Sequence, residues 1–343
     1  MTKHAKHLLW TSLTIVITLV LGFWEFNLWT KKEPSVHYNT VSRVADLSVG
    51  NTNKKSISFL FGGDLMFDRL VNHTFKDSGF DQIFADLNES FFQKDIVFAN
   101  MEGPISDKPI DDNFLSGSMV FNMPPSSIDT LKRTKINGVS LANNHTLNAG
   151  NSGFFTTQNL LKTAGIKYGG YENKFDTESI IRYDTKIPVS IIVFNYLSYK
   201  NIDEVATAIS REKTTGRFVV IFPHWGNEYD LKHNNTQEFV AHKLIDAGGD
   251  IVIGTHPHVV QDVELYRNHA IFYSLGNFVF DQLFSKDTQE GLLLTGKLTE
   301  KELTINLNPI KAEKMKLRPM NAIEKKDLLD RINDGQETIN LEF

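Results

Sequence analysis

The sequence predicts an α/β protein whose β-sheet is covered by helices on both faces. Short apolar runs rich in β-branched and aromatic residues recur along the chain, as expected of buried strands. Helix-like segments lie between several of these runs, and strands that alternate with helices form sheets covered on both faces. With 343 residues, of which 41% are apolar and 22% charged, the chain can bury a sizeable core.

The expected elements follow in chain order. Seven apolar runs are expected as strands: Ile57–Phe61, Ile96–Ala99, Val139–Ala142, Val189–Phe194, Phe218–Phe222, Asp250–Ile253 and Ala270–Ser274. Helices are expected at Ser126–Thr134, which begins with a serine cap, and at Thr236–Ala247, which ends before two glycines. Late antiparallel strands are expected at Gly291–Gly296 and Leu303–Leu307.

Residues 1–29 are expected to form one transmembrane helix, an uncleaved signal anchor. Leu8 to Trp29 is apolar apart from hydroxyl residues until Glu25, close to the ~20 residues that cross a bilayer. Lys3 and Lys6 precede this stretch, and no small-residue cleavage site follows it. A buried core helix is the alternative, but it would have little protein to bury it. We expect a single-pass protein of the cell membrane with its domain on the extracytoplasmic side.

The rest of the chain divides into a tether, a domain and a tail. Residues 30–56 are polar and unpatterned, residues 57–310 form the expected domain, and residues 311–343 form a lysine-rich C-terminal tail. A net charge of −5 gives no reason to expect nucleic acid as a partner. Because the chain has no cysteine, disulfides and thiolate ligands are excluded, and any metal must be held by His, Asp, Glu or Asn.

Nearly every apolar run ends directly in metal-competent or amide side chains. The segments read FLFGGD, VFANMEG, VSLANNH, VIFPHWGNE, IVIGTHPH and YSLGN. In α/β sheets, ligands bind in the loops at the carboxyl ends of the strands. We therefore expect these clusters to meet in one shared site.

The motifs differ in how strongly each indicates a site. Asp64 and Glu102, taken alone, could equally be ordinary turn residues. Asn143, Asn144 and His145 follow an apolar strand, and burying two amides and an imidazole is costly unless something binds them. An Asn-rich turn is the alternative for this motif.

His256 and His258 form the strongest pair. Two imidazoles two residues apart in extended backbone point the same way, and Pro257 favours an extended conformation at His256. Neutral imidazole is a common ligand of first-row transition metals, so we expect both rings to face one ion. His224 has the same setting after another strand, but a lone histidine there is more often structural.

Taken in order, the motifs resemble those of the CapA family of poly-gamma-glutamate capsule synthesis proteins. They are G-D-x-M-x-x-R from Gly63, N-x-E from Asn100, A-N-N-H, H-W-G, G-x-H-P-H and the stretch Ser274–Asp281. The resemblance covers residues 57–285. It implies a calcineurin-type metallophosphoesterase domain, a layered α/β sandwich of sheets flanked by helices, with two metal ions at strand ends.

The resemblance also implies roles for individual residues. It makes six residues metal ligands for one or two divalent ions such as Mn, Zn, Fe or Mg: Asp64, Glu102, Asn144, His224, His256 and His258. His145 takes the place of the histidine that protonates a leaving group or holds the attacked oxyanion. Arg69 is a candidate for binding an anionic substrate, with a surface arginine as the alternative.

Further candidates for substrate binding stand in or beside the same motifs. They are Asn100, Asn143, Trp225, Tyr229, Asn277 and Asp281, with packing as the alternative for the two aromatic residues.

Met66 departs from the phosphoesterase pattern. The first motif of that superfamily is D-x-H, whereas Met66 places a thioether in the third position, and a thioether suits soft ions rather than Mg, Mn or Zn. One of the two metal positions is therefore short of a ligand. It is weak, empty or filled differently.

The expected function is that of a membrane-anchored accessory of poly-gamma-glutamate capsule synthesis or export. Its expected partners are the membrane, poly-gamma-glutamate or another anionic polymer, and capsule synthase subunits. Two alternatives stay open. One is a metal-dependent hydrolase of a phosphoester, or of an amide bond in polymer or cell wall, and the other is a non-catalytic scaffold of the synthase complex.

Overall fold

The computed structural model describes residues 55–107 and 119–343. The predicted anchor at residues 1–29 and nearly all of the predicted tether lie outside the described residues. Within the described ranges, no helix is long and apolar enough to cross a membrane.

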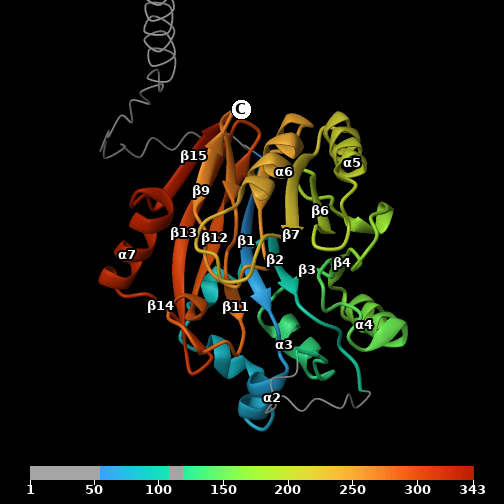
Figure 1. The fold of residues 1–343 in the computed structure, drawn as a ribbon, viewed down its shortest axis with the longest axis vertical. Helices are drawn as coiled ribbons and strands as arrows, with labels where there is room; N and C mark the ends of the chain where they lie inside the picture. Colours follow the sequence, from blue (N-terminus) through green and yellow to red (C-terminus); the bar gives the residue numbers. More distant parts are fainter. Residues whose placement is uncertain (1–54, 108–118) are drawn as a thin grey trace, which may run out of the picture. The chain divides into compact units, whose positions relative to one another are not determined.

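Two β-sheets carry the fold (Figure 1). The nine strands of the first sheet are β1 (Ser56–Leu65), β2 (Ile96–Met101), β3 (Gly138–Ser140), β4 (Lys167–Gly169), β11 (Asn277–Val279), β12 (Glu290–Thr299), β13 (Glu302–Glu313), β14 (Lys316–Pro319) and β15 (Thr338–Glu342). The six of the second are β5 (Ile180–Tyr183), β6 (Val189–Asn195), β7 (Phe218–His224), β8 (Ile251–Ile253), β9 (Val263–Tyr266) and β10 (His269–Phe272).

The strand order places parallel strands in the middle of both sheets. The nine-stranded sheet has the order β14-β13-β12-β1-β2-β3-β4, with β11 paired to β1 and β15 paired to β13. Strands β1 to β4 run parallel, whereas β1 pairs with β12 in the antiparallel sense. The six-stranded sheet has the order β5-β6-β7-β8-β10-β9, in which β6, β7, β8 and β10 are parallel. Parallel strands bring their carboxyl ends to one edge, where loops can build a site.

Helices complete the layers. They are α2 (Arg69–Phe75), α3 (Ser127–Arg133), α4 (Gly150–Ala164), α5 (Ile202–Thr214), α6 (Asn235–Asp246) and α7 (Ala322–Asn333), with 3₁₀ turns η1 (Phe80–Phe84), η2 (Glu89–Phe91), η4 (Thr177–Ser179) and η5 (Asp287–Gln289).

Three buried apolar clusters separate the layers. The first lies between the sheets, where Phe98 of β2 meets Phe222 of β7 with ring centroids 5.0 Å apart. The second joins the nine-stranded sheet to η1, α3 and α4, and the third joins the six-stranded sheet to α5 and α6. The predicted α/β class is confirmed: the two sheets pack face to face, α3, α4, α5 and α6 cover their outer faces, and α7 packs against the cluster between the sheets.

The predicted elements agree with the structure where the apolar runs are long. All seven predicted strands coincide with or overlap β1, β2, β3, β6, β7, β8 and β10, and the two predicted helices overlap α3 and α6. The predicted late strands fall within β12 and β13. Residues 311–343, expected as a tail, form the end of β13, then β14, α7 and β15, and β15 pairs with β13 along Glu302–Asn306.

A close backbone approach at Gly63 fixes the end of β1. A Cβ atom at this position would lie 1.9 Å from the carbonyl oxygen of Gly276, so only glycine fits there. The next residue, Asp64, donates its N–H to that same oxygen at 3.1 Å. Because the two segments touch here, the Asp64 carboxylate is presented at the strand end.

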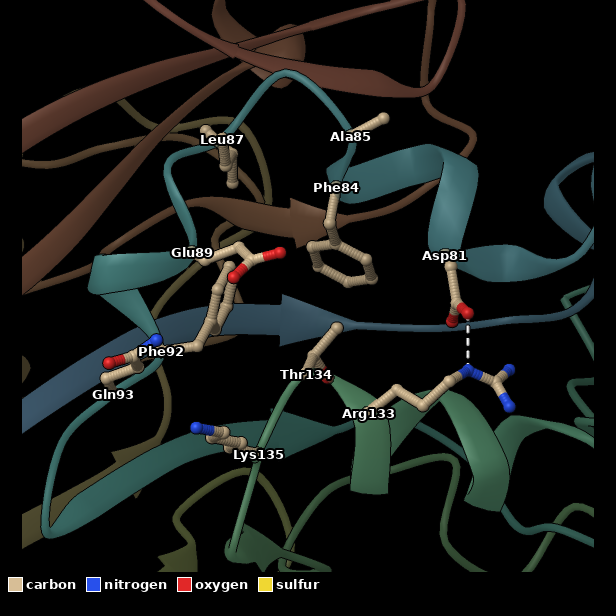
Figure 2. Close-up of a pocket in the computed structure, with 10 residues that line it drawn as sticks. All are labelled: Asp81, Phe84, Ala85, Leu87, Glu89, Phe92, Gln93, Arg133, Thr134 and Lys135. Atoms are coloured by element: carbon tan, nitrogen blue, oxygen red, sulfur yellow. Dashed lines mark hydrogen bonds and ion pairs between the residues drawn. The ribbon is translucent and has the colours of Figure 1, made fainter.

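A surface pocket of about 320 Å³ lies apart from this edge (Figure 2). Phe84, Leu87 and Phe92 give it an apolar floor, and Arg133 forms an ion pair with Asp81 at its rim. Phe92 precedes β2, so this pocket lies toward the amino ends of the parallel strands. The carboxyl ends of those strands hold a different set of side chains.

Candidate metal centre

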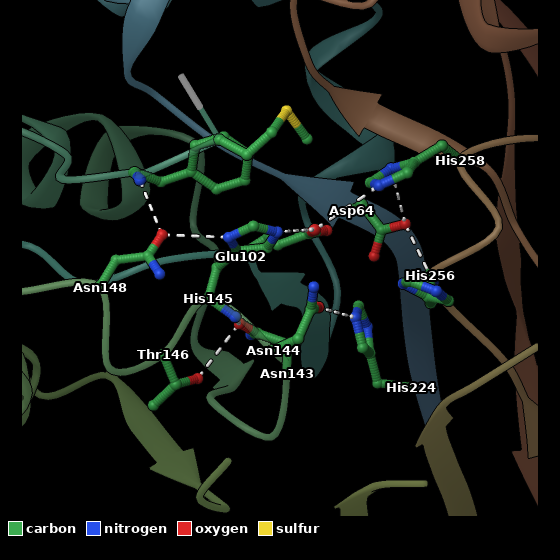
Figure 3. Close-up of polar contacts among 12 residues, drawn as sticks. Asp64, Glu102, Asn143, Asn144, His145, Thr146, Asn148, His224, His256 and His258 are labelled. Carbon is green, nitrogen blue, oxygen red and sulfur yellow. Dashed lines mark hydrogen bonds and ion pairs between the residues drawn. The ribbon is translucent and has the colours of Figure 1, made fainter. Parts of the chain in front are cut away.

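Five strand ends bring carboxylates, imidazoles and amides together (Figure 3). The nine-stranded sheet contributes Asp64 from β1, Glu102 directly after β2, and the loop with Asn144 and His145 after β3. The six-stranded sheet contributes His224 at the end of β7 and the loop after β8, which carries His256 and His258. Both sheets therefore build the same site.

The two carboxylates are fully buried. Asp64 Oδ1 accepts a hydrogen bond from Asn100 Nδ2 at 2.8 Å, and Oδ2 accepts one from the backbone N–H of His256 at 3.1 Å. Burial raises the pKa of Asp64 to about 7. Burial, together with the nearby charge of Asp64, raises the pKa of Glu102 well above its ordinary value.

Glu102 gives the clearest indication that the site binds a cation. Among the described residues, neither of its side-chain oxygens has a hydrogen-bond partner, although both are buried. Its Oε1 lies 3.6 Å from His258 Nε2 and 3.8 Å from His145 Nε2. A buried charge without compensation costs several kcal/mol, so a buried carboxylate is normally paired or bound to a metal.

The three candidate histidine ligands are held neutral by burial. Burial lowers the pKa of His256 to about 4 and of His258 to about 3, and it lowers the pKa of His224 well below its usual value. Neutral imidazole is the form that binds metal. His224 Nε2 lies 2.8 Å from Asn144 Oδ1, and His258 Nδ1 lies 3.5 Å from Asp64 Oδ2.

The backbone at His256 and His258 corrects one prediction. Their φ angles are +98° and +59°, so neither residue has the extended conformation expected from the His-Pro-His motif. Left-handed backbone at non-glycine residues costs of order 1–3 kcal/mol and persists at functional sites where the surroundings impose it. Here the His256 N–H is turned onto Asp64, which links the β8 loop to the end of β1.

The potential ligand atoms form two adjoining groups in the described part of the chain. Asp64, Glu102 and His224 offer atoms that all lie within 4.8 Å of one another. A second group satisfies the same limit and consists of Glu228, His256 and His258. Sequence reasoning missed Glu228, whose only signal is an acidic residue four positions after a strand-end histidine.

These donors fit a divalent transition metal. Imidazole nitrogen and carboxylate oxygen together suit ions such as Mn, Fe or Zn, and cysteine is absent from the sequence. The buried oxygens of Glu102 and the buried Nδ1 of His256 have no partner within the described residues. A cation would supply that partner and would also offset the buried negative charge.

His145 lies beside the metal ligands with a fixed ring orientation. Its Nδ1 donates to Asn148 Oδ1 at 3.0 Å, and the same oxygen accepts the backbone N–H of Phe121 at 2.7 Å. The Phe121 ring packs on the imidazole with centroids 4.1 Å apart. This arrangement directs Nε2 toward Glu102, and burial lowers the pKa of His145.

Three amides that were predicted to bind substrate bond to other residues of the site. Asn143 Nδ2 donates to Asn100 Oδ1 at 3.1 Å and to the carbonyl oxygen of Met101 at 2.9 Å, and both asparagines are fully buried. Asn277 Oδ1 lies 3.0 Å from His258 Nδ1. These amides orient the carboxylate and imidazole ligands, because they bond to one another and to those ligands.

Arg69 and Asp281 form a partly buried ion pair near His145. Arg69 Nε lies 3.1 Å from Asp281 Oδ2, and the guanidinium carbon lies 5.5 Å from the Phe121 ring centroid. Arg69 has φ +52°, and the following N–H, of Leu70, donates to the same Asp281 oxygen at 3.1 Å. Asp281 therefore holds both the side chain and the backbone of this arginine.

Comparison with known proteins identifies the family. Residues 58–282 match the family model described as bacterial capsule synthesis protein PGA_cap. The chain belongs to this family. The matched segment contains every candidate ligand from Asp64 to His258, together with Arg69 and Asp281.

Individual PGA_cap relatives cover much of the chain. It is 30% identical to PGA biosynthesis protein CapA of Bacillus subtilis over 315 residues, which are 85% of this chain and 77% of that protein. It is 30% identical to capsule biosynthesis protein CapA of Bacillus anthracis over 270 residues, 71% of this chain and 65% of that protein. A probable polyglutamine synthesis accessory protein of Mycobacterium tuberculosis is 26% identical over 215 residues, 54% of this chain and 56% of that protein. The predicted resemblance to the CapA family is confirmed.

Two aromatic candidates in this PGA_cap domain have different surroundings. Trp225 is fully buried, donates from Nε1 to the carbonyl oxygen of Tyr273 at 2.8 Å, and belongs to the core beneath α5 and α6. It packs there and does not line the site. Tyr229 is 41% exposed, stacks near His258 with centroids 6.2 Å apart, and accepts a hydrogen bond from Gln282 at 3.2 Å.

The sulfur of Met66 accepts a hydrogen bond from the backbone and is not placed as a metal ligand. The backbone N–H of Asp68 donates to Met66 Sδ at 2.9 Å, and the side chain is buried against Phe121 and Phe280. The position that the phosphoesterase pattern gives to histidine is thus part of a small apolar cluster in this PGA_cap protein.

Proposed function

We propose that this chain is a divalent-metal-dependent enzyme of poly-gamma-glutamate capsule synthesis. The observation that carries the proposal is Glu102, a fully buried carboxylate whose two oxygens have no partner among the described residues. It stands beside Asp64, His224 and His258, which are suitable ligands for the same cation. Membership of the PGA_cap family and the names of the CapA relatives support the capsule role.

The residues divide the work between binding and proton transfer. Asp64, Glu102, Asn144, His224, His256 and His258 hold the metal. When bound, divalent ions polarise the attacked group and make water a nucleophile near neutral pH. His145 exchanges a proton at Nε2, because its Nδ1–H is committed to Asn148 and fixes the tautomer.

Arg69 binds an anionic group of the substrate in this proposal. Asp281 takes Nε, so the guanidinium is held in place before the substrate arrives. A carboxylate-rich polymer such as poly-gamma-glutamate has the charge that this arginine attracts. The buried ion pair also lowers the ordering cost of binding, since Arg69 loses little rotamer freedom.

Metal content and polymer output test the proposal together. We expect the purified full-length chain to contain at least one divalent transition metal ion by mass spectrometry, and the double variant Asp64→Ala/His258→Ala, which removes one ligand from each of the two groups, to contain none. Cells that carry only this variant should lose poly-gamma-glutamate. Stoichiometric metal in the double variant would refute the ligand assignment, and full polymer output without metal would establish a scaffold role instead.

The bond that is cut is tested with two substrates. The metal-loaded chain is incubated with a γ-glutamyl oligomer and, separately, with bis(p-nitrophenyl) phosphate. We expect cleavage of the oligomer, because Arg69 suits its carboxylates. Cleavage of the phosphodiester alone would assign the chain to the phosphoesterases.

Membrane attachment is a separate part of the proposal. Residues 1–29 anchor the chain, and the domain lies outside the cytoplasmic membrane, as the basic leader and the apolar stretch from Leu8 indicate. Protease added to intact spheroplasts should digest the domain. Protection equal to that of a cytoplasmic control would reverse this topology.

A further inference from the structure

Glu228 reaches the metal centre from the loop after β7, although none of the sequence motifs gave this residue a role. The residue follows His224 at the end of β7 and lies in a loop, beside the loop that follows β8. Its carboxylate and the imidazoles of His256 and His258 offer ligand atoms within 4.8 Å of one another. Two imidazoles and one carboxylate are a common protein ligand set for divalent transition metals.

A second observation indicates an ion-binding site at the same place. His256 Nδ1 is buried and has no hydrogen-bond partner among the described residues, and the residue is only 6% exposed. A buried ring nitrogen is normally satisfied, so an unsatisfied one indicates a partner that binds there. His256 belongs to the same group of potential ligands as Glu228.

The backbone holds the Glu228 loop against the histidine loop. The N–H of Tyr229, the next residue, donates to the carbonyl oxygen of Pro257 at 2.8 Å, between the two histidines. Tyr229 has φ +67°, a left-handed conformation that a non-glycine residue adopts only when its surroundings impose it. Glu228 is therefore placed by its main chain.

We propose that Glu228, with His256 and His258, binds a second metal ion and supplies the ligand that Met66 does not. This inference rests on the proposed function, because it assumes the centre around Asp64 and Glu102. The phosphoesterase pattern takes this ligand from the β1 end of the nine-stranded sheet, at the position of Met66. In this chain it comes from the six-stranded sheet, through the loop after β7.

The two metal positions should differ in affinity. Asp64, Glu102 and His224 are all buried, whereas Glu228 lies in a loop and is more exposed than the two histidines beside it. Water and chelators can reach an exposed ligand more easily. The Glu228 position should therefore be the weaker one and should exchange its ion faster.

Charge also favours two ions over one. Asp64, Glu102 and Glu228 bring three carboxylates together, so a single divalent ion leaves the ionised set with excess negative charge. Two divalent ions give the same set a net positive charge. A positively charged site attracts the anionic substrate that the proposed function requires.

Titration with Mn²⁺ tests the inference on the purified full-length chain. We expect the wild type to bind two ions, one more weakly, and to show the spin-coupled electron paramagnetic resonance spectrum of a manganese pair. Glu228→Gln should keep the tight ion and lose the coupled spectrum. Loss of a residue that only supports a metal ligand lowers metal affinity about 10–100-fold. Loss of the ligand Glu228 should lower the affinity of the weak position by at least as much.

Two control variants separate the ligand from its neighbourhood. Asp230→Asn removes an exposed carboxylate from the same loop. Asp230 accepts a hydrogen bond from Asn227 at 2.9 Å, and its variant should keep both ions. Met66→Leu should also keep both, because its sulfur faces the N–H of Asp68. Circular dichroism melting in chelator verifies that Glu228→Gln is folded.

The outcomes distinguish this inference from the proposed function. A wild type that binds no ion at all would refute both. A wild type that saturates at one ion, or a Glu228→Gln variant that binds two ions as tightly as the wild type, would refute only the second position. The metal centre around Asp64 and Glu102 would then stand alone.

Discussion

Single residues at the candidate centre separate metal binding from proton transfer. His145 lies 3.8 Å from Glu102 but bonds through its other nitrogen to Asn148, whereas Asn144 faces His224 at 2.8 Å. Asn144 therefore faces the metal ligands, whereas the neighbouring His145 is oriented for proton transfer. Their variants should differ accordingly.

We predict that His145→Ala keeps its metal and loses about 10²–10⁴-fold in turnover, as expected when a positioned acid or base is removed. Asn144→Ala should lose metal occupancy as well as activity, because it deletes a ligand. Metal analysis beside an assay of cleavage or of polymer output measures both quantities. Loss of metal from His145→Ala equal to that from His256→Ala would make His145 a ligand.

The pH dependence of metal affinity should follow Asp64. Burial raises its pKa to about 7, so below that pH a proton must leave before the carboxylate can bind metal. The pKa values of His256 and His258 are lowered to about 4 and 3, so these rings are already neutral there. Affinity should therefore rise with pH.

Loss of one proton from Asp64, with a pKa of about 7, predicts a gain in affinity of at least roughly tenfold between pH 6 and pH 8, and Glu102, whose pKa is also raised by burial, adds to this gain in the same direction. Calorimetric titration in two buffers of different ionisation enthalpy would count the protons released. An affinity that stays constant over this range would show that Asp64 is already ionised without metal.

The sequence revealed most of these residues but not their conformations. His256 and His258 stood out because two imidazoles follow an apolar run, yet their left-handed backbone depends on contacts with Asp64 and Tyr229 from distant segments. Glu228 was missed because one acidic residue in a loop has many ordinary roles. Spatial proximity alone identifies it.

At the scale of elements, the close contact between the end of β1 and the segment that leads into β11 positions the first carboxylate. A Cβ on Gly63 would meet the Gly276 oxygen at 1.9 Å, and Asp64 is the next residue. We predict that Gly63→Ala destabilises the fold by about 1–3 kcal/mol or more, as overpacking does, and also weakens metal binding. Urea unfolding and metal titration measure the two effects.

Gly216→Ala is the matched control for Gly63→Ala. Gly216 has φ +77°, and no described atom would lie within 4 Å of its Cβ, so the change adds only backbone strain of roughly 1–2 kcal/mol. It should lower stability and leave metal affinity unchanged. Equal metal affinity in the two variants would mean that the contact between Gly63 and Gly276 does not position Asp64.

Elements were predictable from sequence where burial dominates the pattern. Strands such as β6 and β7 are buried along almost their whole length and read as continuous apolar runs. Helix α4 was missed because Gly150, Gly153 and several hydroxyl residues give it weak helix propensity. It forms because Phe154 and Leu161 pack on the nine-stranded sheet, and such tertiary contacts leave no local signal.

At the scale of the whole molecule, the metal centre joins the two sheets. Asp64 and Glu102 belong to one sheet and His224 to the other, so a bound ion must be released when the sheets separate. Metal at 100 times its dissociation constant should add about 2.7 kcal/mol to the free energy of unfolding. For a domain of this size we predict a melting temperature higher by roughly 5 °C or more.

Differential scanning calorimetry with metal and with chelator measures this shift. The double variant Asp64→Ala/His258→Ala, which lacks one ligand from each group, should melt at the same temperature in both conditions. If saturating metal leaves the melting temperature of the wild type unchanged, the folded chain binds no ion.

The central place of β1 constrains how the protein is made. The first described strand lies between β2 and β12, and its antiparallel partner begins only at Glu290. Until that late segment has been synthesised, one edge of β1 stays open and the nine-stranded sheet cannot close. Because pairing over so long a sequence separation is slow, we expect the nine-stranded sheet to form late in synthesis. A secretion channel accepts an unfolded chain, so this topology is compatible with the extracytoplasmic location proposed above.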